Sequence, residues 1–216
     1  MEFKDVMKQR RAVNFFDSTR DISNAQIQQI IETAALSPSG FNLQPWKVIA
    51  VKDKQQKENL RKAAMNQPKI TEAPVVLIIL ADREGWKKGN DSFEKNFLQS
   101  VKEGTLKKEQ YEWFAKATQS LYGATAERQL AFACKNAGFF AMSLMLAAKD
   151  AGFDSHPMDG FDIDGVRELF HIPEQYWIVL LLALGYFDES KTLIPAKWRK
   201  RYQDIVVSFH DTLIES

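Results

Sequence analysis

Two pairs of basic residues stand where regular structure is expected to give way to a loop. Arg10 and Arg11 follow a short helical pattern, and Lys197 and Arg199 lie near the carboxyl end of the chain. Guanidinium groups match phosphate oxygens in a two-pronged geometry, so both pairs are candidate phosphate ligands. Either pair alone is more often a solvated surface feature than a binding site.

Two irregular segments supply polar groups of another kind. SPSGFNLQPW (residues 37–46) carries hydroxyls and amides that suit a polyol or a ring edge, and PMDGFD (157–162) offers backbone N–H groups around a glycine. The first segment is equally readable as a simple helix-to-strand turn, and the second as a turn after a helix. Together with the basic pairs, they provide the contacts that a flat phosphorylated cofactor would need.

Familiar reaction motifs are missing from the sequence. The ten glycines form neither GxGxxG nor GxxxxGK[ST], and neither GxSxG nor HExxH occurs. His156, His171 and His210 are far apart and lack ligand spacing, so we predict no metal site and no histidine-based nucleophilic triad. If the chain is an enzyme, we expect an organic cofactor to carry the chemistry, and we predict no catalytic side chain.

Composition limits the remaining possibilities. The 216 residues are 45% hydrophobic and 26% charged, with a formal net charge of +1, which gives no overall attraction to nucleic acid or to a membrane surface. A single cysteine, Cys134, fits a reducing compartment. The N-terminal stretch MEFKDVMKQRR has no apolar signal region. We therefore predict a cytoplasmic protein without nucleic-acid or membrane partners.

A long helix over residues 127–152 is the centre of the predicted fold. From Ala137 to Ala148 the only polar side chain is Ser143, so the helix is expected to be buried on every face. The uncharged window between Lys135 and Lys149 is shorter than the roughly 20 residues that cross a bilayer. Gly152 suits the left-handed position after a helix end. The helix then leads into HPMDGFD, which is expected to be irregular.

The remaining chain mixes helical and strand patterns and predicts one α+β domain spanning residues 1–216. Strands are expected over 46–51, 74–80 and 176–184, with 204–209 as a short strand or extended tail. Helices are expected over 2–9, from the capping box of Ser23 and Gln26 to before Pro38, over 52–65, and over 164–171 with Asp164 as N-cap. Residues 82–122 form a charged excursion of one or two amphipathic helices that is a candidate lid.

The motifs together resemble one known family. RRAVNFF, SPSGFNLQPW, AMNQPKITEAPVV, the SLMLAA helix, PMDGFD and the late KWR occur in the order of the FMN-dependent nitroreductases, from Arg10 to Arg199. The resemblance implies a mixed β-sheet wrapped by helices around a long buried central helix. It also implies an interlocked homodimer that exchanges the C-terminal tail, residues 195–216, and binds FMN at the subunit interface.

The resemblance also implies roles for particular residues. The FMN phosphate would be held by Arg10, Arg11, Lys197 and Arg199. The backbone around Ala12 and the side chain of Asn14 would approach the ribityl chain and the polar edge of the ring. The FMN of the other subunit would be reached by Pro38, Ser39 and Asn42. The pyrimidine edge would meet Asn66 and Gln67, and the isoalloxazine would face Pro157, Met158, Asp159 and Gly160. A backbone N–H near Asp159 or Gly160 would point at flavin N5.

The implied activity is ping-pong transfer of hydride from NAD(P)H through flavin N5 to a small-molecule electron acceptor, a nitroaromatic or a quinone. The excursion would shape the acceptor pocket through aromatic side chains, which are equally expected to be ordinary packing residues: Trp86, Phe93, Phe97, Trp113 and Phe114. Two other readings stay open: another flavin enzyme of this fold, such as a dehalogenase or a flavin-consuming enzyme, and a non-catalytic flavin-binding dimer.

Three positions depart from the pattern that the family shows most often. Ala12 and Gly40 stand where serine is frequent, and Asn14 stands where a basic residue is frequent. An uncharged Asn14 would stabilise an anionic reduced flavin less than a cation would. None of the three departures removes the expected phosphate ligands, so FMN binding is still expected.

Overall fold

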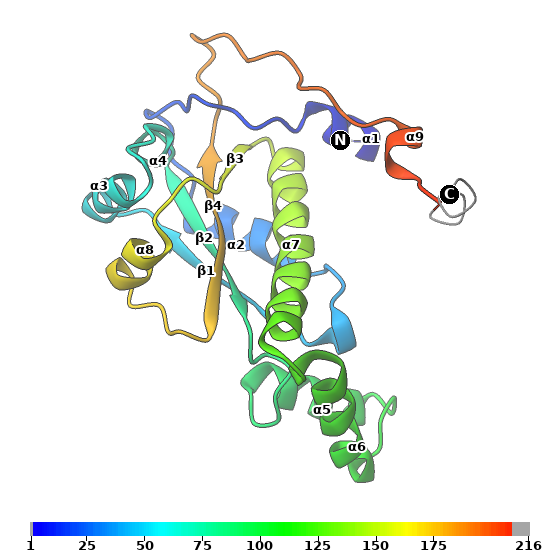
Figure 1. Cartoon of the computed structure of the whole chain (residues 1–216). Helices are drawn as coiled ribbons and strands as arrows, with labels where there is room; N and C mark the ends of the chain where they lie inside the picture. The colour runs from blue at the N-terminus through cyan, green and yellow to red at the C-terminus, as the bar shows by residue number, and fades with distance from the viewer. Residues whose placement is uncertain (1, 209–216) are drawn as a thin grey trace, which may run out of the picture.

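The computed structural model describes residues 2–208, and its centre is a four-stranded sheet (Figure 1). The strands are β1 (Trp46–Val51), β2 (Val75–Asp82), β3 (Asp154–Met158) and β4 (Tyr176–Gly185), in the order β1-β2-β4-β3. All eight residues of β2 are buried, as its uninterrupted aliphatic run predicts for a central strand. The three strands expected from the sequence are therefore present, and β3 was not expected.

Every pairing within this sheet is antiparallel. The register of β2 against β4 shifts between Ile79 and Leu80, which marks a bulge in the two central strands. In the described part of the chain, parallel pairing is confined to an isolated bridge between Ala12 and Ser155. The α+β class and the long central helix are confirmed, and the parallel component of the expected mixed sheet is this single bridge.

Helices cover both faces of the sheet. One face packs against α2 (Asn24–Ala34) and α7 (Ala126–Asp150), and its core includes Leu77 and Leu182. The other face packs against α3 (Lys54–Ala63), α4 (Lys69–Glu72) and α8 (Ile163–Leu169), and its core includes Ile78 and Leu181 (Figure 1). Neighbouring residues of each strand thus serve different cores, as the alternation of a strand requires.

Helix ends follow the local sequence closely, with one correction. Ser23 and Gln26 form the expected capping box at the start of α2, and Gly152 is left-handed (φ 84°) just after α7. The N-cap of α8 is Asp162, whose carboxylate accepts from the backbone N–H of Asp164. The prediction of Asp164 as N-cap is wrong because the helix begins earlier than the sequence pattern suggested.

The helix α7 is not buried on every face by its own chain. It packs against all four strands and against α2, but Gly138 and Phe139 are exposed, Phe139 by 46%. Among the described residues, α7 is the one helix long and apolar enough to cross a membrane, and 39% of its most apolar window is buried inside the fold. Its packing identifies it as a core helix with one apolar face left uncovered.

The first and last helices of the described chain, α1 (Phe3–Gln9) and α9 (Tyr202–Ile205), lie at the same end of the molecule (Figure 1). The helix α1 packs beside α7, and the extended tail leads to the short helix α9 on that side (Figure 1). Of the short strand or extended tail expected over 204–209, the strand is wrong for the described residues: Asp204 and Ile205 belong to α9, and 206–208 form neither helix nor strand. The tail from Glu189 to Ser208 is exposed throughout. Part of the predicted exchanged segment, residues 209–216, lies outside the described residues.

The excursion forms α5 (Asp91–Lys102) and α6 (Tyr111–Thr118), followed by a π-helical turn, Gln119–Gly123. Its aromatic rings pack against one another: Phe93 and Phe114 are 4.9 Å apart between centroids, and Phe97 and Tyr111 are 5.0 Å apart. Phe93, Phe97, Phe114 and Trp86 are buried, whereas Trp113 is 55% exposed. Ordinary packing therefore accounts for four of the five candidate acceptor-stacking residues.

Candidate functional site

The two basic pairs meet in space. Arg10, Arg11, Lys197 and Arg199 line one cavity of about 180 Å³, although nearly the whole chain separates the two pairs. The other residues that line this cavity are Ala12, Asn14, His156, Ile194 and Pro195. The side chain of Arg11 donates to the carbonyl of Ile194 across this gap in sequence. We call this site the cationic cavity.

Among the described residues, no carboxylate neutralises the charges of the cationic cavity. Burial, followed by the nearby charges of Arg199 and Arg11, lowers the pKa of Arg10. Within residues 2–208, none of the cavity's four cations forms an ion pair with a carboxylate. Cations that repel one another and lack a protein anion match a phosphate group, which accepts bidentate hydrogen bonds from guanidinium.

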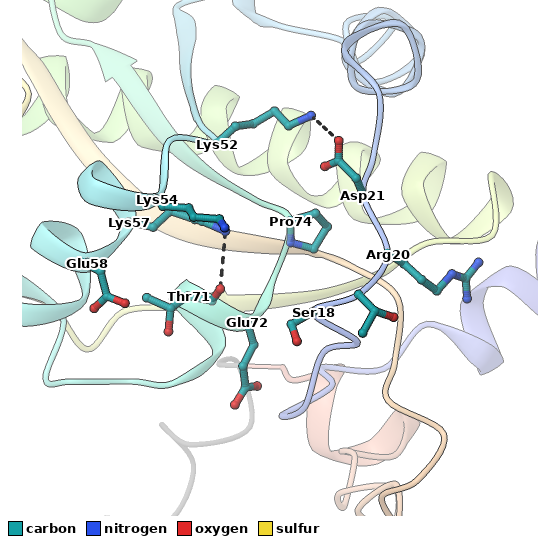
Figure 2. A pocket seen from close by; sticks show the side chains of 11 residues that line it. Ser18, Arg20, Asp21, Lys52, Lys54, Lys57, Glu58, Thr71, Glu72 and Pro74 are labelled. Carbon is teal, nitrogen blue, oxygen red and sulfur yellow. Dashed lines mark hydrogen bonds and ion pairs between the residues drawn. The ribbon is translucent and has the colours of Figure 1, made fainter.

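A larger cavity of about 580 Å³ is also lined by basic side chains, but most of these have partners within the protein (Figure 2). Lys52 pairs with Asp21 at 3.2 Å, and Arg20 turns away from the cavity to lie over the ring of Tyr186, 3.3 Å from its centroid. The buried Lys57 donates to the carbonyl oxygens of Ala73 (2.7 Å) and Thr71 (3.4 Å). Three of the cavity's basic side chains thus have partners inside the protein, which indicates a structural role.

Replacing Lys57 by methionine should therefore destabilise the fold. The variant leaves two carbonyls at the end of α4 without their donor, and we expect the free energy of unfolding to fall by about 1–3 kcal/mol. Lys54→Met, on the same helix but exposed, should change it by less than about 0.5 kcal/mol. Chemical denaturation of both variants measures the difference, and equal stabilities would contradict the structural role of Lys57.

The edge strand β3 brings the PMDGFD segment to the cationic cavity. The backbone N–H of Val13 donates to the carbonyl of Ser155 (3.2 Å), and Nδ1 of His156 donates to the carbonyl of Val13 (2.8 Å). The expectation that HPMDGFD is irregular is wrong for residues 156–158, which belong to β3 (Asp154–Met158), because Pro157 can occupy an edge strand where no neighbour needs its N–H. Asp159 and Gly160 follow as the loop that was expected.

The turn at Met65–Gln67 contacts this loop from the other side. Met65 and Asn66 have left-handed backbones (φ 54° and 55°), a strained conformation that is common at functional sites. The side-chain amide of Gln67 donates to the carbonyl of Gly160 at 2.9 Å and accepts from Lys69 at 3.2 Å. The structure thus brings the predicted residues Asn66 and Gln67 beside Gly160.

Sequence reasoning missed two residues of this site. Lys69 adjoins Gln67, and its charge, together with the larger effect of burial, lowers the pKa of the His156 imidazole. His156 lines the cationic cavity. Both were within reach of the sequence, because Lys69 lies in AMNQPKITEAPVV and His156 directly precedes PMDGFD. Each was passed over because its role depends on residues distant in the chain.

The remaining predicted residues lie elsewhere in the chain's fold. Next to Pro38 and Ser39, the backbone N–H of Gly40 donates to Asn136 Oδ1 (3.0 Å), and the Asn42 amide donates to Asn96 of α5 (3.1 Å). The cationic cavity instead adjoins Ser155, beyond the C-terminal end of α7. Asn136 and that end are about 20 Å apart along the helix. One chain therefore does not bring Pro38, Ser39 and Asn42 to the cationic cavity.

The local geometry of SPSGFNLQPW explains one of its unusual residues. Phe41, Asn42 and Gln44 have left-handed backbones, with φ of 53°, 53° and 47°, which again marks a strained segment. A Cβ at Gly40 would lie 2.6 Å from the hydroxyl oxygen of Tyr122. Glycine at this position, where the family often has serine, thus accommodates the ring of Tyr122.

Comparison with known proteins agrees with this geometry. The model of the nitroreductase family matches residues 7–186, which is most of the chain. The chain therefore belongs to the nitroreductase family, and the resemblance predicted from its motifs is confirmed.

Individual relatives cover nearly the whole chain. MhqN of Bacillus subtilis (strain 168), described as a candidate NAD(P)H nitroreductase, is 32% identical over 95% of this chain and 98% of its own length. The crystal structure of the candidate nitroreductase ydfN from Bacillus subtilis superposes with a TM-score of 0.87 at 31% identity, covering 96% of this chain and 98% of that one. A candidate nitroreductase from Exiguobacterium sibiricum 255-15, solved in complex with FMN, superposes with a TM-score of 0.83 at 26% identity, covering 96% of this chain and 97% of that one.

Proposed function

We propose that this chain is an FMN-dependent NAD(P)H oxidoreductase that reduces nitroaromatic or quinone-type acceptors by a ping-pong mechanism. The expected enzyme class and the expected cofactors, FMN with NAD(P)H as donor, are supported by membership of the nitroreductase family and by the FMN-bound relative. The observation that carries the proposal is the cationic cavity, whose four positive side chains lack a protein anion among the described residues. When bound, FMN supplies reversible hydride transfer at its N5 atom.

Different residues in and around the cavity would bind different parts of FMN. The phosphate is bound by Arg10, Arg11, Lys197 and Arg199, and the chain next to it by the backbone at Ala12 and the side chain of Asn14. The flat ring would be held by the Met65–Gln67 turn and by the loop from Pro157 to Gly160, including Met158 and Asp159. The hydrogen bond between Gln67 and Gly160 fixes these two walls relative to each other, so the backbone N–H groups of the loop are held ready for N5.

Lys69 adds a positive charge to the ring side of the site. Its ammonium is partly desolvated, which lowers its pKa, while Glu72 raises that pKa. A cation near the ring stabilises negative charge that develops on a reduced flavin. Lys69 therefore supplies charge that the uncharged Asn14 does not. No side chain here is required to act as a general acid or base, because the cofactor carries the hydride chemistry.

The active form is a homodimer with FMN at the subunit interface. The uncovered apolar face of α7, centred on Gly138 and Phe139, supports this assembly, and so does the exposed tail with Trp198 and Tyr202, 74% and 78% exposed. Such apolar exposure is typical of a subunit interface. Pro38, Ser39 and Asn42 of one subunit then complete the FMN site of the other, which accounts for their distance from the cationic cavity of their own chain.

The acceptor binds over the same ring after the oxidised nicotinamide has left. Asn42 is hydrogen-bonded to Asn96 of α5. This bond connects the excursion to the SPSGFNLQPW segment, which would reach the FMN of the partner subunit. Within the excursion, Trp113 is the exposed aromatic residue among the five predicted ones. It is therefore the excursion residue that we assign to the acceptor pocket. The single-domain organisation of residues 1–216 and the cytoplasmic location remain predictions.

Initial-rate kinetics test the proposed function. With NADH or NADPH varied at several fixed concentrations of a quinone or a nitroaromatic, a ping-pong enzyme gives parallel double-reciprocal lines. Intersecting lines would contradict the mechanism. Reduction of halogenated aromatics in place of nitro compounds would favour the dehalogenase alternative, and bound FMN without any steady-state turnover would favour a non-catalytic flavin-binding dimer.

A further inference from the structure

His156 is a titratable residue of the cationic cavity that has no part in the phosphate binding described above. His156 stands on the edge strand β3 and lines the cavity together with Arg10, Arg11 and Asn14. Its imidazole is half-buried, and its Nδ1 atom is 2.8 Å from the carbonyl oxygen of Val13. Because a carbonyl oxygen only accepts hydrogen bonds, Nδ1 must carry a hydrogen.

This hydrogen bond fixes which ring nitrogen is free. With Nδ1 protonated, Nε2 of a neutral ring is an acceptor, and it becomes a donor only when the ring takes up a second proton. Among residues 2–208, no hydrogen bond to Nε2 of His156 is formed. The neutral ring therefore offers a phosphate nothing but a lone pair, whereas the charged ring offers a hydrogen-bond donor and a positive charge.

The surroundings determine the charge of His156 before phosphate binds. The charged groups that face it are Arg10 and Arg11 from the segment after α1, Lys197 and Arg199 from the tail, and Lys69 from α4 with Glu72 one turn further along. On its own strand, Asp154 is engaged by Lys149 at 2.9 Å. Burial and the charge of Lys69 lower the pKa of His156, and the hydrogen bond to Val13 raises it by less. The imidazole is thus neutral near pH 7 in the free protein.

We propose that His156 is a further ligand of the FMN phosphate and that its imidazole takes up one proton from solvent when the phosphate binds. The inference rests on the proposed FMN site. A phosphate dianion placed among these cations reverses the local field and favours the imidazolium over the neutral ring. His156 then donates through Nε2 to a phosphate oxygen while it keeps its hydrogen bond to Val13.

The linkage predicts a pH dependence with a definite sign. The FMN complex binds more protons than the free protein over the interval between the two pKa values of His156, so FMN binds more tightly as pH falls through that interval. One coupled proton changes the dissociation constant by at most about tenfold per pH unit. Protonation of the free FMN phosphate, with a pKa near 6, opposes this trend and is common to every variant.

The test compares three proteins over pH 6.5–8.0, with FMN binding followed by quenching of flavin fluorescence. In the wild-type protein and in His171→Asn, the dissociation constant should increase by about fivefold or more toward pH 8.0, since each retains His156. In His156→Gln the increase should be less than about twofold. His171 is the matched control because it lies after α8, outside the lining of the cationic cavity, and its left-handed backbone (φ 50°) suits asparagine.

Two further measurements use the wild-type protein, so they test the role of His156 even if the His156→Gln variant folds poorly. Calorimetry at pH 7 in buffers of different ionisation enthalpy should show net proton uptake on FMN binding to the wild-type protein. Histidine-labelled wild-type protein should show one imidazole whose NMR titration moves to higher pH when FMN is added. A pH slope that is the same in His156→Gln and wild type, or no imidazole shifted by FMN, would overturn the role of His156. Failure of the wild-type protein to bind FMN at any pH would instead overturn the proposed function.

Discussion

Replacing both Arg10 and Arg199 by alanine is expected to weaken FMN binding by two orders of magnitude or more. The two guanidinium groups come from opposite ends of the chain and line the same cavity, and the charge of Arg199 contributes to the lowered pKa of Arg10. Each charge-assisted hydrogen bond to a phosphate contributes about 1.5–3 kcal/mol, so losing two costs about 3–6 kcal/mol. That is a factor of more than a hundred in the dissociation constant.

The measurement is the flavin content of the purified protein, followed by titration of the FMN-free form. Lys54→Ala with Lys62→Ala is the matched control, because both lysines are exposed on α3 and the change in net charge is the same. The control should retain a full flavin complement. A full complement in the Arg10→Ala, Arg199→Ala protein would refute the assignment of the phosphate site, whatever the activity of that variant.

Replacing Phe139 by glutamate is expected to convert the proposed dimer to monomers and to release FMN. Phe139 is 46% exposed on the uncovered face of α7 in the single chain. A carboxylate there would be desolvated by a packed interface and left without a partner, at a cost of several kcal/mol on each side of a symmetric contact. FMN should be lost as well, since in the proposed dimer Pro38, Ser39 and Asn42 contact FMN only across the interface.

Sedimentation velocity and flavin content, measured on the same samples, test this expectation. Phe139→Leu preserves an apolar side chain of similar size and should remain dimeric with its FMN. A Phe139→Glu protein that stays dimeric would show that this face of α7 is not the interface. A monomeric variant that keeps its FMN with wild-type affinity would show that one chain alone forms the site.

Much of the fold was predictable because its signals are local. The aliphatic runs of β2 and β4 are typical of strands buried on both faces, as all of β2 is and as β4 is over its last five residues. The capping box at Ser23 fixes the start of α2 by hydrogen bonds within four residues. The basic residues of the cationic cavity could also be singled out as candidate phosphate ligands, since guanidinium groups match phosphate oxygens in a bidentate geometry.

The features that could not be predicted from the sequence depend on contacts between segments that are distant in the chain. The strand β3 has neither alternation nor an apolar run, and its pairing with β4 and its bridge to Ala12 exist only in the folded chain. The roles of Lys69 and His156 likewise depend on the folded chain, in which His156 lines the cationic cavity and the charge of Lys69 acts on its imidazole. The apolar composition of α7 predicted burial but could not show that the face with Phe139 is left uncovered by its own chain.

The most direct test of the central claim is a visible absorption spectrum of the purified protein, followed by anaerobic addition of NADH and then of NADPH. We expect a flavin band that is bleached by one or both nucleotides. The band should return when a quinone is added. A flavin band that neither nucleotide bleaches would contradict the assignment as an NAD(P)H oxidoreductase. The absence of any flavin band, even after FMN is supplied, would contradict the cofactor site itself.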